Sequence, residues 1–254
     1  MCLILFAYQV SPDLPFAVAA NRDELYARPA KPAHFWEEPI GLLAGRDESA
    51  GGTWLGVNRN GRFAAVTNFA DSDTPDTPRS RGALAATFLG SDASSADFAH
   101  QIVGPDYRGF NLLLWDGVEL LYTSNQGVTR VLEPGYYGLS NAELGARWPK
   151  VVRGIERLRM SCQANLTADD LIKILHDDEV PPDEQLPHRG RPIEVERTIA
   201  PCFIRGEEYG TRASTAVIYY RQHLTFVEQL YDPGGLPKGR VSFDLDMEGG
   251  RRAG

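Results

Sequence analysis

Apolar and turn-forming residues alternate at the start of the chain in a pattern that is typical of two paired strands. Residues 2–10 form an apolar run, a Ser-Pro-Asp turn follows, and residues 15–24 begin with a second apolar run. Pro and Asp favour the central positions of a tight turn. We therefore expect an antiparallel hairpin with Pro12 and Asp13 at its tip.

Three more hairpins are expected further along the chain, because apolar segments rich in β-branched and aromatic residues occur in pairs. In two of these pairs the connection is Asn-Gly or Asp-Gly, the dipeptides that most strongly favour a tight hairpin turn. The paired segments are 53–58 with 62–68, the two halves of 110–125, and 211–220 with 224–231.

Four helices are expected between these strands. They cover residues 82–90, 94–103, 148–162 and 167–178, and the last begins with a Thr-Ala-Asp-Asp sequence close to a capping box. Polar segments interrupted by proline predict loops at 28–39, 71–81 and 179–197. Strand pairs at both ends with helices between them are typical of an α+β protein whose helices cover the outer faces of antiparallel sheets.

Composition and charge narrow the class of protein. The chain has 254 residues, 43% apolar and 24% charged, as in ordinary globular proteins. We expect one domain over residues 1–254, with a frayed tail from about residue 232, where glycine and charged residues become frequent. The net charge of −8 and the lack of any long basic run argue against nucleic acid as a partner.

The sequence contains neither an expected membrane-spanning segment nor an expected metal-binding motif. Its longest apolar run covers residues 1–8, far short of the roughly 20 residues that span a bilayer, and lacks a basic leader. The three cysteines and five histidines do not have the spacing of a zinc site, so neither a disulfide framework nor a metal or other cofactor is expected. We expect a cytoplasmic protein without stable membrane insertion.

Cys2 is the strongest candidate for catalysis. It follows Met1, which aminopeptidases remove when the next residue is small. Removal would leave Cys2 with a thiol and a free α-amine of pKa near ~8, so that one residue supplies both a nucleophile and its base. The alternative interpretation is that Cys2 is a small buried residue of an apolar strand.

Asp23 is the candidate partner of this N-terminal group. If the hairpin turn is centred between Pro12 and Asp13, the numbers of cross-strand partners add up to 25, and Cys2 faces Asp23. Opposed Cβ atoms lie about 5 Å apart, close enough for a carboxylate to hold the α-ammonium group. A shift of one residue in the register would remove this pairing.

Six short motifs follow one another from residue 1 to about 230. They are Met1-Cys2-Leu-Ile, Asn21-Arg-Asp-Glu24, Gly51-Gly-Thr-Trp-Leu-Gly56, Val66-Thr-Asn68, Gly138-Leu-Ser-Asn141 and Tyr209-Gly-Thr-Arg-Ala-Ser-Thr215. In these motifs the chain resembles the NRDE family, whose eukaryotic members are called transport and Golgi organization protein 2. That family is similar in turn to N-terminal-nucleophile hydrolases of the penicillin V acylase and bile salt hydrolase type, which implies a four-layer αββα sandwich.

The resemblance implies roles for particular residues. Cys2 would be the nucleophile and Asp23 the anchor of its amine. Asn68 matches the oxyanion-hole asparagine of the acylases, and Asn141 matches their second active-site asparagine. Amide groups suit these roles because they donate hydrogen bonds to a developing oxyanion without titrating. In isolation, a turn residue at the end of a strand would be the better explanation of each asparagine.

The catalytic arginine is less clearly indicated. The acylases carry an arginine a few residues before the aspartate, whereas here Arg22 precedes Asp23 directly, and neighbouring strand residues point to opposite faces. Arg205 and Arg212 are the other candidates, and Arg212 is preferred because it opens a predicted strand.

Further residues are expected to bind the substrate. Asn21 and Arg22 belong to the motif that contains Asp23, and Trp54 is flanked by glycines that would leave room beside it. Trp54 suits a core position at least as well.

Two functions agree with these features. The first is an N-terminal cysteine amidohydrolase that cleaves a non-peptide C–N amide bond through a thioester on Cys2. The second is a carrier with the same fold and no turnover, because the eukaryotic relatives are associated with haem and lipid handling. The expected partner is therefore a small-molecule amide or a hydrophobic ligand, and the oligomeric state is left open.

Overall fold

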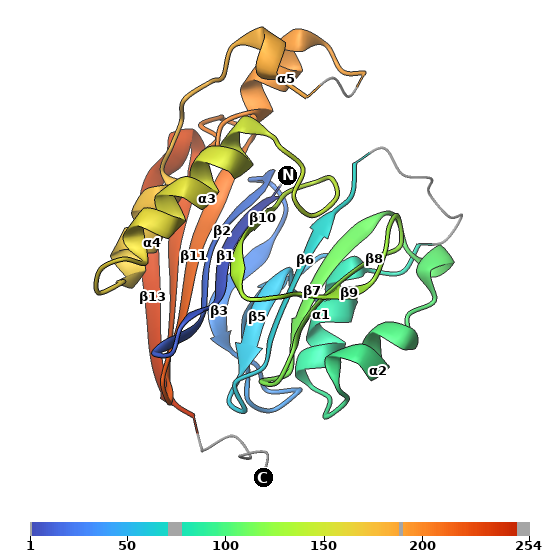
Figure 1. The fold of residues 1–254 in the computed structure, drawn as a ribbon. Helices are drawn as coiled ribbons and strands as arrows, with labels where there is room; N and C mark the ends of the chain where they lie inside the picture. The colour runs from blue at the N-terminus through green and yellow to red at the C-terminus, as the bar shows by residue number, and fades with distance from the viewer. Residues whose placement is uncertain (1, 71–77, 188–189, 248–254) are drawn as a thin grey trace.

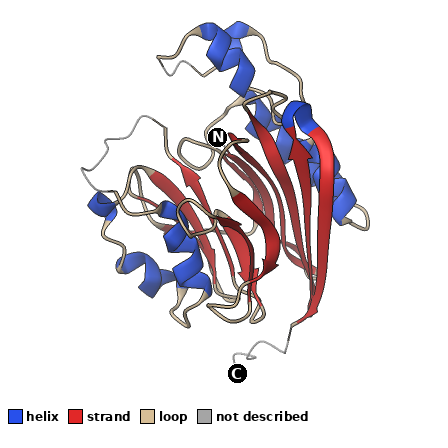
Figure 2. Ribbon diagram, turned by 180° about the vertical axis from the view of Figure 1, so that it is seen from behind, coloured by secondary structure: helices blue, strands red, loops and turns tan. Residues whose placement is uncertain are grey.

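Two antiparallel sheets stack face to face, and helices cover their outer faces (Figures 1 and 2). The computed structural model describes residues 2–70, 78–187 and 190–247. Sheet A has six strands in the order β10 (Gly135–Leu139), β1 (Cys2–Ser11), β2 (Leu14–Leu25), β11 (Tyr209–Tyr220), β12 (His223–Asp232) and β13 (Leu236–Asp246). Sheet B has seven strands in the order β3 (Ala30–Phe35), β4 (Leu42–Asp47), β5 (Leu55–Asn58), β6 (Phe63–Asn68), β7 (Phe110–Trp115), β8 (Leu120–Ser124) and β9 (Arg130–Val131).

The helices form the two outer layers. On sheet A lie α3 (Pro149–Ser161) and α4 (Ala168–Leu175), and on sheet B lie α1 (Arg81–Leu89) and α2 (Ser95–His100). A further helix, α5 (Ile193–Ile199), and three short 3₁₀ helices at Gly104–Asp106, Asp183–Gln185 and Pro233–Gly235 lie in the connections. The expected four-layer αββα sandwich is confirmed. No helix in the described ranges has the length and apolar character needed to cross a membrane.

Three apolar layers hold the sandwich together. In β1, Ile4 and Phe6 point into the layer between the sheets, whereas Leu3 and Leu5 point into the layer beneath α3 and α4. The third layer packs α1 and α2 against sheet B around Phe88. Because successive side chains of a strand point to opposite faces, a strand buried on both faces needs an unbroken apolar run, and this explains the N-terminal sequence.

The expected hairpins and the four expected helices are present, with shifts of a few residues at their ends. The cap of α4 is a capping box in which the Thr167 hydroxyl accepts from the Asp170 amide and the Asp170 carboxylate accepts from the Thr167 amide. Of the loop predicted at 71–81, residues 71–77 lie outside the described residues and Arg81 begins α1.

Several predictions of irregular chain were wrong. The loop predicted at 28–39 contains β3, and the loop predicted at 179–197 contains a 3₁₀ turn and most of α5. The frayed tail predicted from about residue 232 is instead ordered as β13, the edge strand of sheet A, through Asp246. Only one face of β13 is partly buried. Charged residues, proline and glycine are common in such an edge strand because they prevent pairing with another chain, and the same residues are common in loops, which explains the wrong prediction.

The register of the first hairpin differs from the expected one. Ser11 pairs with Leu14 around the predicted turn, but a bulge follows, and Tyr8 pairs with Phe16. Within the bulge Gln9 has a left-handed backbone, with φ of 48°. The extra residue shifts by one the partner of every β1 residue from Tyr8 back to Cys2, so Cys2 faces Arg22 and not Asp23.

Candidate functional site

A cavity of about 850 Å³ opens between the two sheets, and Cys2 lies in its wall. Residues of β2 and β11 in sheet A, of β4 and β6 in sheet B, and of the start of α1 line it. The expected site residues Cys2, Arg22, Asp23, Trp54, Asn68 and Arg212 all contribute to the lining. This volume lies within the usual range of small-molecule sites.

Cys2 is held by the segment that follows β10. Its backbone nitrogen donates to Asn141 Oδ1 at 3.2 Å, and its carbonyl accepts from Ser140 Oγ at 2.8 Å. The Ser140 carbonyl in turn accepts from Thr67 Oγ1 at 2.7 Å, which ties this segment to β6 of sheet B. Burial raises the pKa of the Cys2 thiol, so the thiol is protonated at neutral pH and requires a base to become a nucleophile.

The two asparagines are brought together. Asn141 is buried, and its Nδ2 donates to the backbone carbonyl of Asn68 at 2.8 Å while its Oδ1 accepts from Cys2. Asn68 is the last residue of β6, and its side-chain amide makes no hydrogen bond to the rest of the described chain. The geometry therefore makes Asn141 a positioning residue and leaves the Asn68 amide available to a ligand.

Asp23 lies one residue past the end of the β1–β2 pairing. Its side chain is only 2% exposed, and Oδ1 accepts from Thr211 Oγ1 of β11 at 2.7 Å. Burial raises the pKa of Asp23 above its ordinary value. The Asp23 backbone amide donates to the Cys2 thiol, so Asp23 is next to the N-terminal residue although it is not its cross-strand partner.

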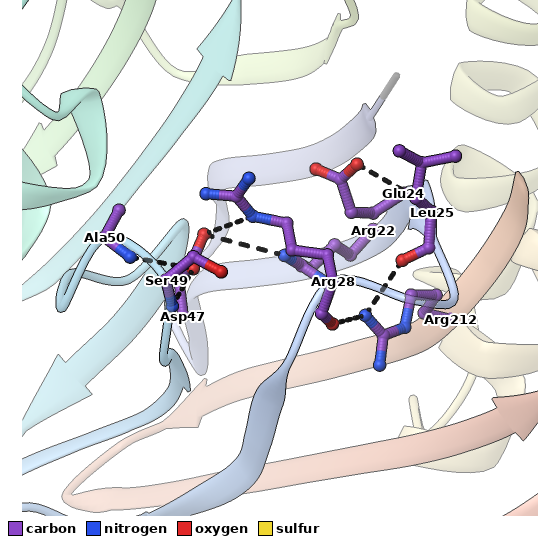
Figure 3. Close-up of polar contacts among 8 residues, drawn as sticks. All are labelled: Arg22, Glu24, Leu25, Arg28, Asp47, Ser49, Ala50 and Arg212. Atoms are coloured by element: carbon purple, nitrogen blue, oxygen red, sulfur yellow. Dashed lines mark hydrogen bonds and ion pairs between the residues drawn. The ribbon is translucent and has the colours of Figure 1, made fainter.

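The structure gives the three candidate arginines different surroundings, and Figure 3 shows two of them, Arg22 and Arg212. Arg22 lines the cavity opposite Cys2, and its guanidinium lies 3.9 Å from Asp47, which Arg28 also binds at 2.8 Å. Arg212 is the bulged residue of β11, and it donates to the carbonyls of Leu25 and Arg28, which holds the turn after β2. Arg22 is therefore the better placed of these two to meet a ligand.

Arg205 does not belong to the cavity. Its guanidinium pairs with Asp178 at 2.9 Å and donates to the Gly234 carbonyl, and it is not part of the cavity lining.

Of the other two residues expected to bind substrate, Trp54 lines the cavity and Asn21 does not. Asn21 is fully buried beneath α4, where its Nδ2 donates to the carbonyls of Cys202 and Leu175 and its Oδ1 accepts from Ser214 Oγ. It does not line the cavity, so the expected role in binding substrate is not supported, and Asn21 anchors the helical layer to β2. Trp54 lines the cavity and also packs against two of the apolar layers, so it has the expected core contacts, and its role in binding substrate stays a prediction.

Glu228 and Arg81 are among the cavity residues that were not anticipated from the sequence. Glu228 on β12 is 4% exposed, burial raises its pKa to about 7, and its Oε1 accepts from the Ala33 amide of β3 at 2.7 Å. It occupies an inward position among Leu224, Phe226 and Leu230, and this interruption of an apolar alternation is a signal that could have identified it. Arg81 opens α1 and carries no such signal.

The described residues contain no group of three or more His, Cys, Asp or Glu side chains that could hold a metal ion. Cys2, Cys162 and Cys202 are all free thiols. The chemistry available in the cavity is therefore that of one thiol, buried carboxyl groups, amides and several guanidinium groups.

The layer order and topology define the class of protein. Conjugated bile acid hydrolase from Clostridium perfringens, solved as its C2A mutant, superposes with a TM-score of 0.56 at 9% identity, over 97% of this chain and 92% of that chain. The fold is thus that of the N-terminal-nucleophile hydrolases.

The sequence comparisons define the family. Residues 1–233 match the family described as Transport and Golgi organisation 2. The chain is 37% identical to the transport and Golgi organization protein 2 homolog of Bos taurus and 34% identical to that of Homo sapiens, in each case over 90% of this chain and 92% of the relative. The protein belongs to the transport and Golgi organisation 2 family.

Proposed function

We propose that the protein is an N-terminal cysteine amidohydrolase that cleaves a non-peptide C–N amide bond. The observation that carries the proposal is the position of Cys2, whose thiol lies in the wall of the cavity while Asn141 Oδ1 binds its nitrogen at 3.2 Å. After removal of Met1 that nitrogen becomes an α-amine next to the thiol. An amine with a pKa near ~8 is a suitable base for a thiol that burial keeps protonated.

The proposed reaction has two steps. The α-amine takes the thiol proton, Cys2 Sγ attacks the substrate carbonyl, and the C–N bond breaks as the leaving amine receives that proton, which leaves a thioester. Water then loses a proton to the α-amine and attacks the thioester, and the thiol leaves in its protonated form. Asn68 donates to the oxyanion, Asp23 holds the α-ammonium group, and Arg22 supplies positive potential.

A carrier function is the second candidate, and the size of the cavity favours it. About 850 Å³ with Trp54, Val66 and Leu230 in its walls has room for a hydrophobic ligand such as haem or an acyl lipid. If Met1 stays in place, the α-amine is absent from Cys2 and the same cavity binds without turnover. In either case we propose a cytoplasmic protein whose partner is a small molecule.

The position of the α-amine provides the test. The intact mass of the purified protein reports whether Met1 is removed, and a panel of fatty-acyl amides is then assayed for release of the free amine and for an acyl adduct on Cys2. We expect activity in the processed protein and none in Cys2→Ala or in a protein with one serine inserted between Met1 and Cys2. That insertion keeps the thiol and removes its amine, so equal activity with it would overturn the autocatalytic base.

A further inference from the structure

The cavity has the opposite charge to the rest of the protein. The whole chain carries 26 basic and 34 acidic residues. In contrast, the cavity lining includes nine arginine and lysine side chains and five aspartate and glutamate side chains. Two of those five, Asp23 and Glu228, are buried, and burial raises the pKa of each. Positive side chains in one cavity repel each other, which destabilises the protein unless a negative charge compensates them. A surplus of positive charge in a cavity therefore indicates that an anionic ligand binds there.

Much of this positive charge already has a protein partner. Asp47 lies between Arg22 and Arg28, as Figure 3 shows. Three further basic residues of the lining are also paired: Lys31 with Glu48, Arg79 with Asp106, and Lys238 with Asp232. The positive charges of these residues are compensated by the protein itself, so they do not indicate a ligand.

Four basic residues of the lining have no ion pair with the described residues, but Arg46 lies over the Trp36 ring and Arg212 donates to the carbonyls of Leu25 and Arg28. Arg81 and Arg108 are the other two. Within the described residues neither makes an ion pair, and the one hydrogen bond of the Arg81 guanidinium goes to the neutral carbonyl of Gly109 at 3.0 Å. Burial, with the adjacent charge of Arg108, lowers the pKa of Arg81. Arg81 also lies close enough to Cys2 for a thiolate there to stabilise its charge. Two neighbouring guanidinium groups without a carboxylate therefore belong to the same cavity as the candidate nucleophile.

We infer that the cavity binds an anionic ligand, an amide that carries a carboxylate or a phosphate, and that Arg81 and Arg108 hold its negative group. Only the amide bond of the ligand rests on the proposed function. A carrier with the same positively charged cavity would bind an anionic ligand equally well. Guanidinium groups bind carboxylate and phosphate through two parallel hydrogen bonds, so both anions suit the pair. Trp54, Val66 and Leu230 supply the apolar wall for the remainder of the ligand.

Binding is measured on Cys2→Ala protein by calorimetry, so that the result does not depend on turnover. The probes share one acyl chain: decanoylglycine carries a carboxylate, decanoylethanolamine phosphate carries a phosphate, and decanoylethanolamine is neutral. We expect at least one anionic probe to bind roughly tenfold or more tightly than the neutral one, the gain of a charge-assisted hydrogen bond. The first two probes distinguish carboxylate from phosphate recognition.

Substitutions locate the negative group. Arg108→Gln, at an exposed position, and Arg81→Gln should each remove most of the preference for the anionic probe and leave the neutral probe unchanged, while Arg81→Lys should keep part of it. Arg130→Gln, on the exposed edge strand β9, is the matched control and should change nothing. Circular dichroism confirms that each variant is folded.

The outcomes separate this inference from the proposed function. Anion-selective binding with no hydrolysis in the unmutated protein supports the inference and contradicts the amidohydrolase. Hydrolysis of neutral and anionic amides at the same rate, or equal affinity for all three probes, overturns the inference and leaves the hydrolase intact. Selectivity that survives both Arg81→Gln and Arg108→Gln also overturns it.

Discussion

Cys2 is the cross-strand partner of Arg22 in the first hairpin, and Asp23 lies one residue beyond the end of that pairing. The bulge at Gln9 produces this relationship, since it shifts the register by one residue between the turn and the N-terminus. As a result Arg22 is opposite Cys2 across the two strands, and Asp23 contacts the thiol through its backbone amide while its carboxyl group accepts from Thr211.

The choice among the three arginines can be tested by substitution. Arg22→Gln should lower kcat/KM for an amide substrate by at least tenfold, because it removes the positive charge opposite Cys2. Arg205→Gln removes contacts that lie outside the cavity, the exposed ion pair with Asp178 and the hydrogen bond to the Gly234 carbonyl, and should leave kcat/KM within about twofold. Steady-state rates of amine release measure both. If Arg205→Gln had the larger effect, the assignment of Arg22 would be wrong.

Asn141 connects Cys2 to the end of β6, and its loss should be visible in stability as well as in activity. Asn141→Ala removes two hydrogen bonds of a buried side chain, one to the Asn68 carbonyl and one from the Cys2 nitrogen, so we expect the free energy of unfolding to fall by about 1–3 kcal/mol. Urea denaturation measures the change. Asn165→Ala, at an exposed position before α4, is the control and should cost less than about 0.5 kcal/mol. Equal effects of the two substitutions would contradict the role of Asn141.

Glu228 should make the stability depend on pH. Burial raises its pKa from the ordinary value of 4.5 to about 7, so between these two pH values the folded protein keeps a proton that the unfolded chain releases. Ionisation of Glu228 therefore costs stability, and its contribution falls as the pH rises from about 4.5 to 7, by up to about 3 kcal/mol.

Glu228→Gln removes this dependence and can still accept the hydrogen bond from the Ala33 amide. We therefore expect the variant to gain stability relative to the unmutated protein between pH 5 and pH 8. Urea unfolding of both proteins at several pH values is the measurement. Parallel pH profiles would show that Glu228 titrates normally.

Gly52 allows sheet B to approach the start of α1. A Cβ atom at this position would lie 2.4 Å from the Gly82 carbonyl carbon, a backbone atom that cannot move aside without shifting the helix. Gly52→Ala should therefore destabilise the protein by about 1–3 kcal/mol and perturb the cavity wall at Arg81. Gly127→Ala, with only Ser124 Cβ at 3.9 Å, is the control for the change of residue type. Thermal unfolding compares them, and similar melting temperatures would refute the steric argument.

Local signals in the sequence were sufficient for most of the secondary structure. The turn dipeptides placed the hairpins, and Thr167 with Asp170 placed the start of α4, because these features depend on residues only a few positions apart. The apolar runs of β1 and β2 predicted the first hairpin, and the structure shows that both strands are buried over most of their length. Where such signals were weak, as in β3, β10 and β13, the strands were missed, since pairing partners distant in the sequence stabilise them.

The site itself was only partly predictable. The N-terminal motif and the family resemblance pointed to Cys2, Asp23, Asn68 and Asn141, and these residues do gather at one end of the sheets. No local pattern, however, contains the bulge that turns Arg22 towards Cys2 or the approach of Arg81 from the start of α1, and the interrupted apolar alternation at Glu228 does not by itself give the shift of its pKa. The sequence alone thus determined the four hairpins and the four main helices, because neighbouring residues decide those elements. The set of charged side chains in the cavity depends on the tertiary structure, because the two sheets bring these side chains together and exclude water from them.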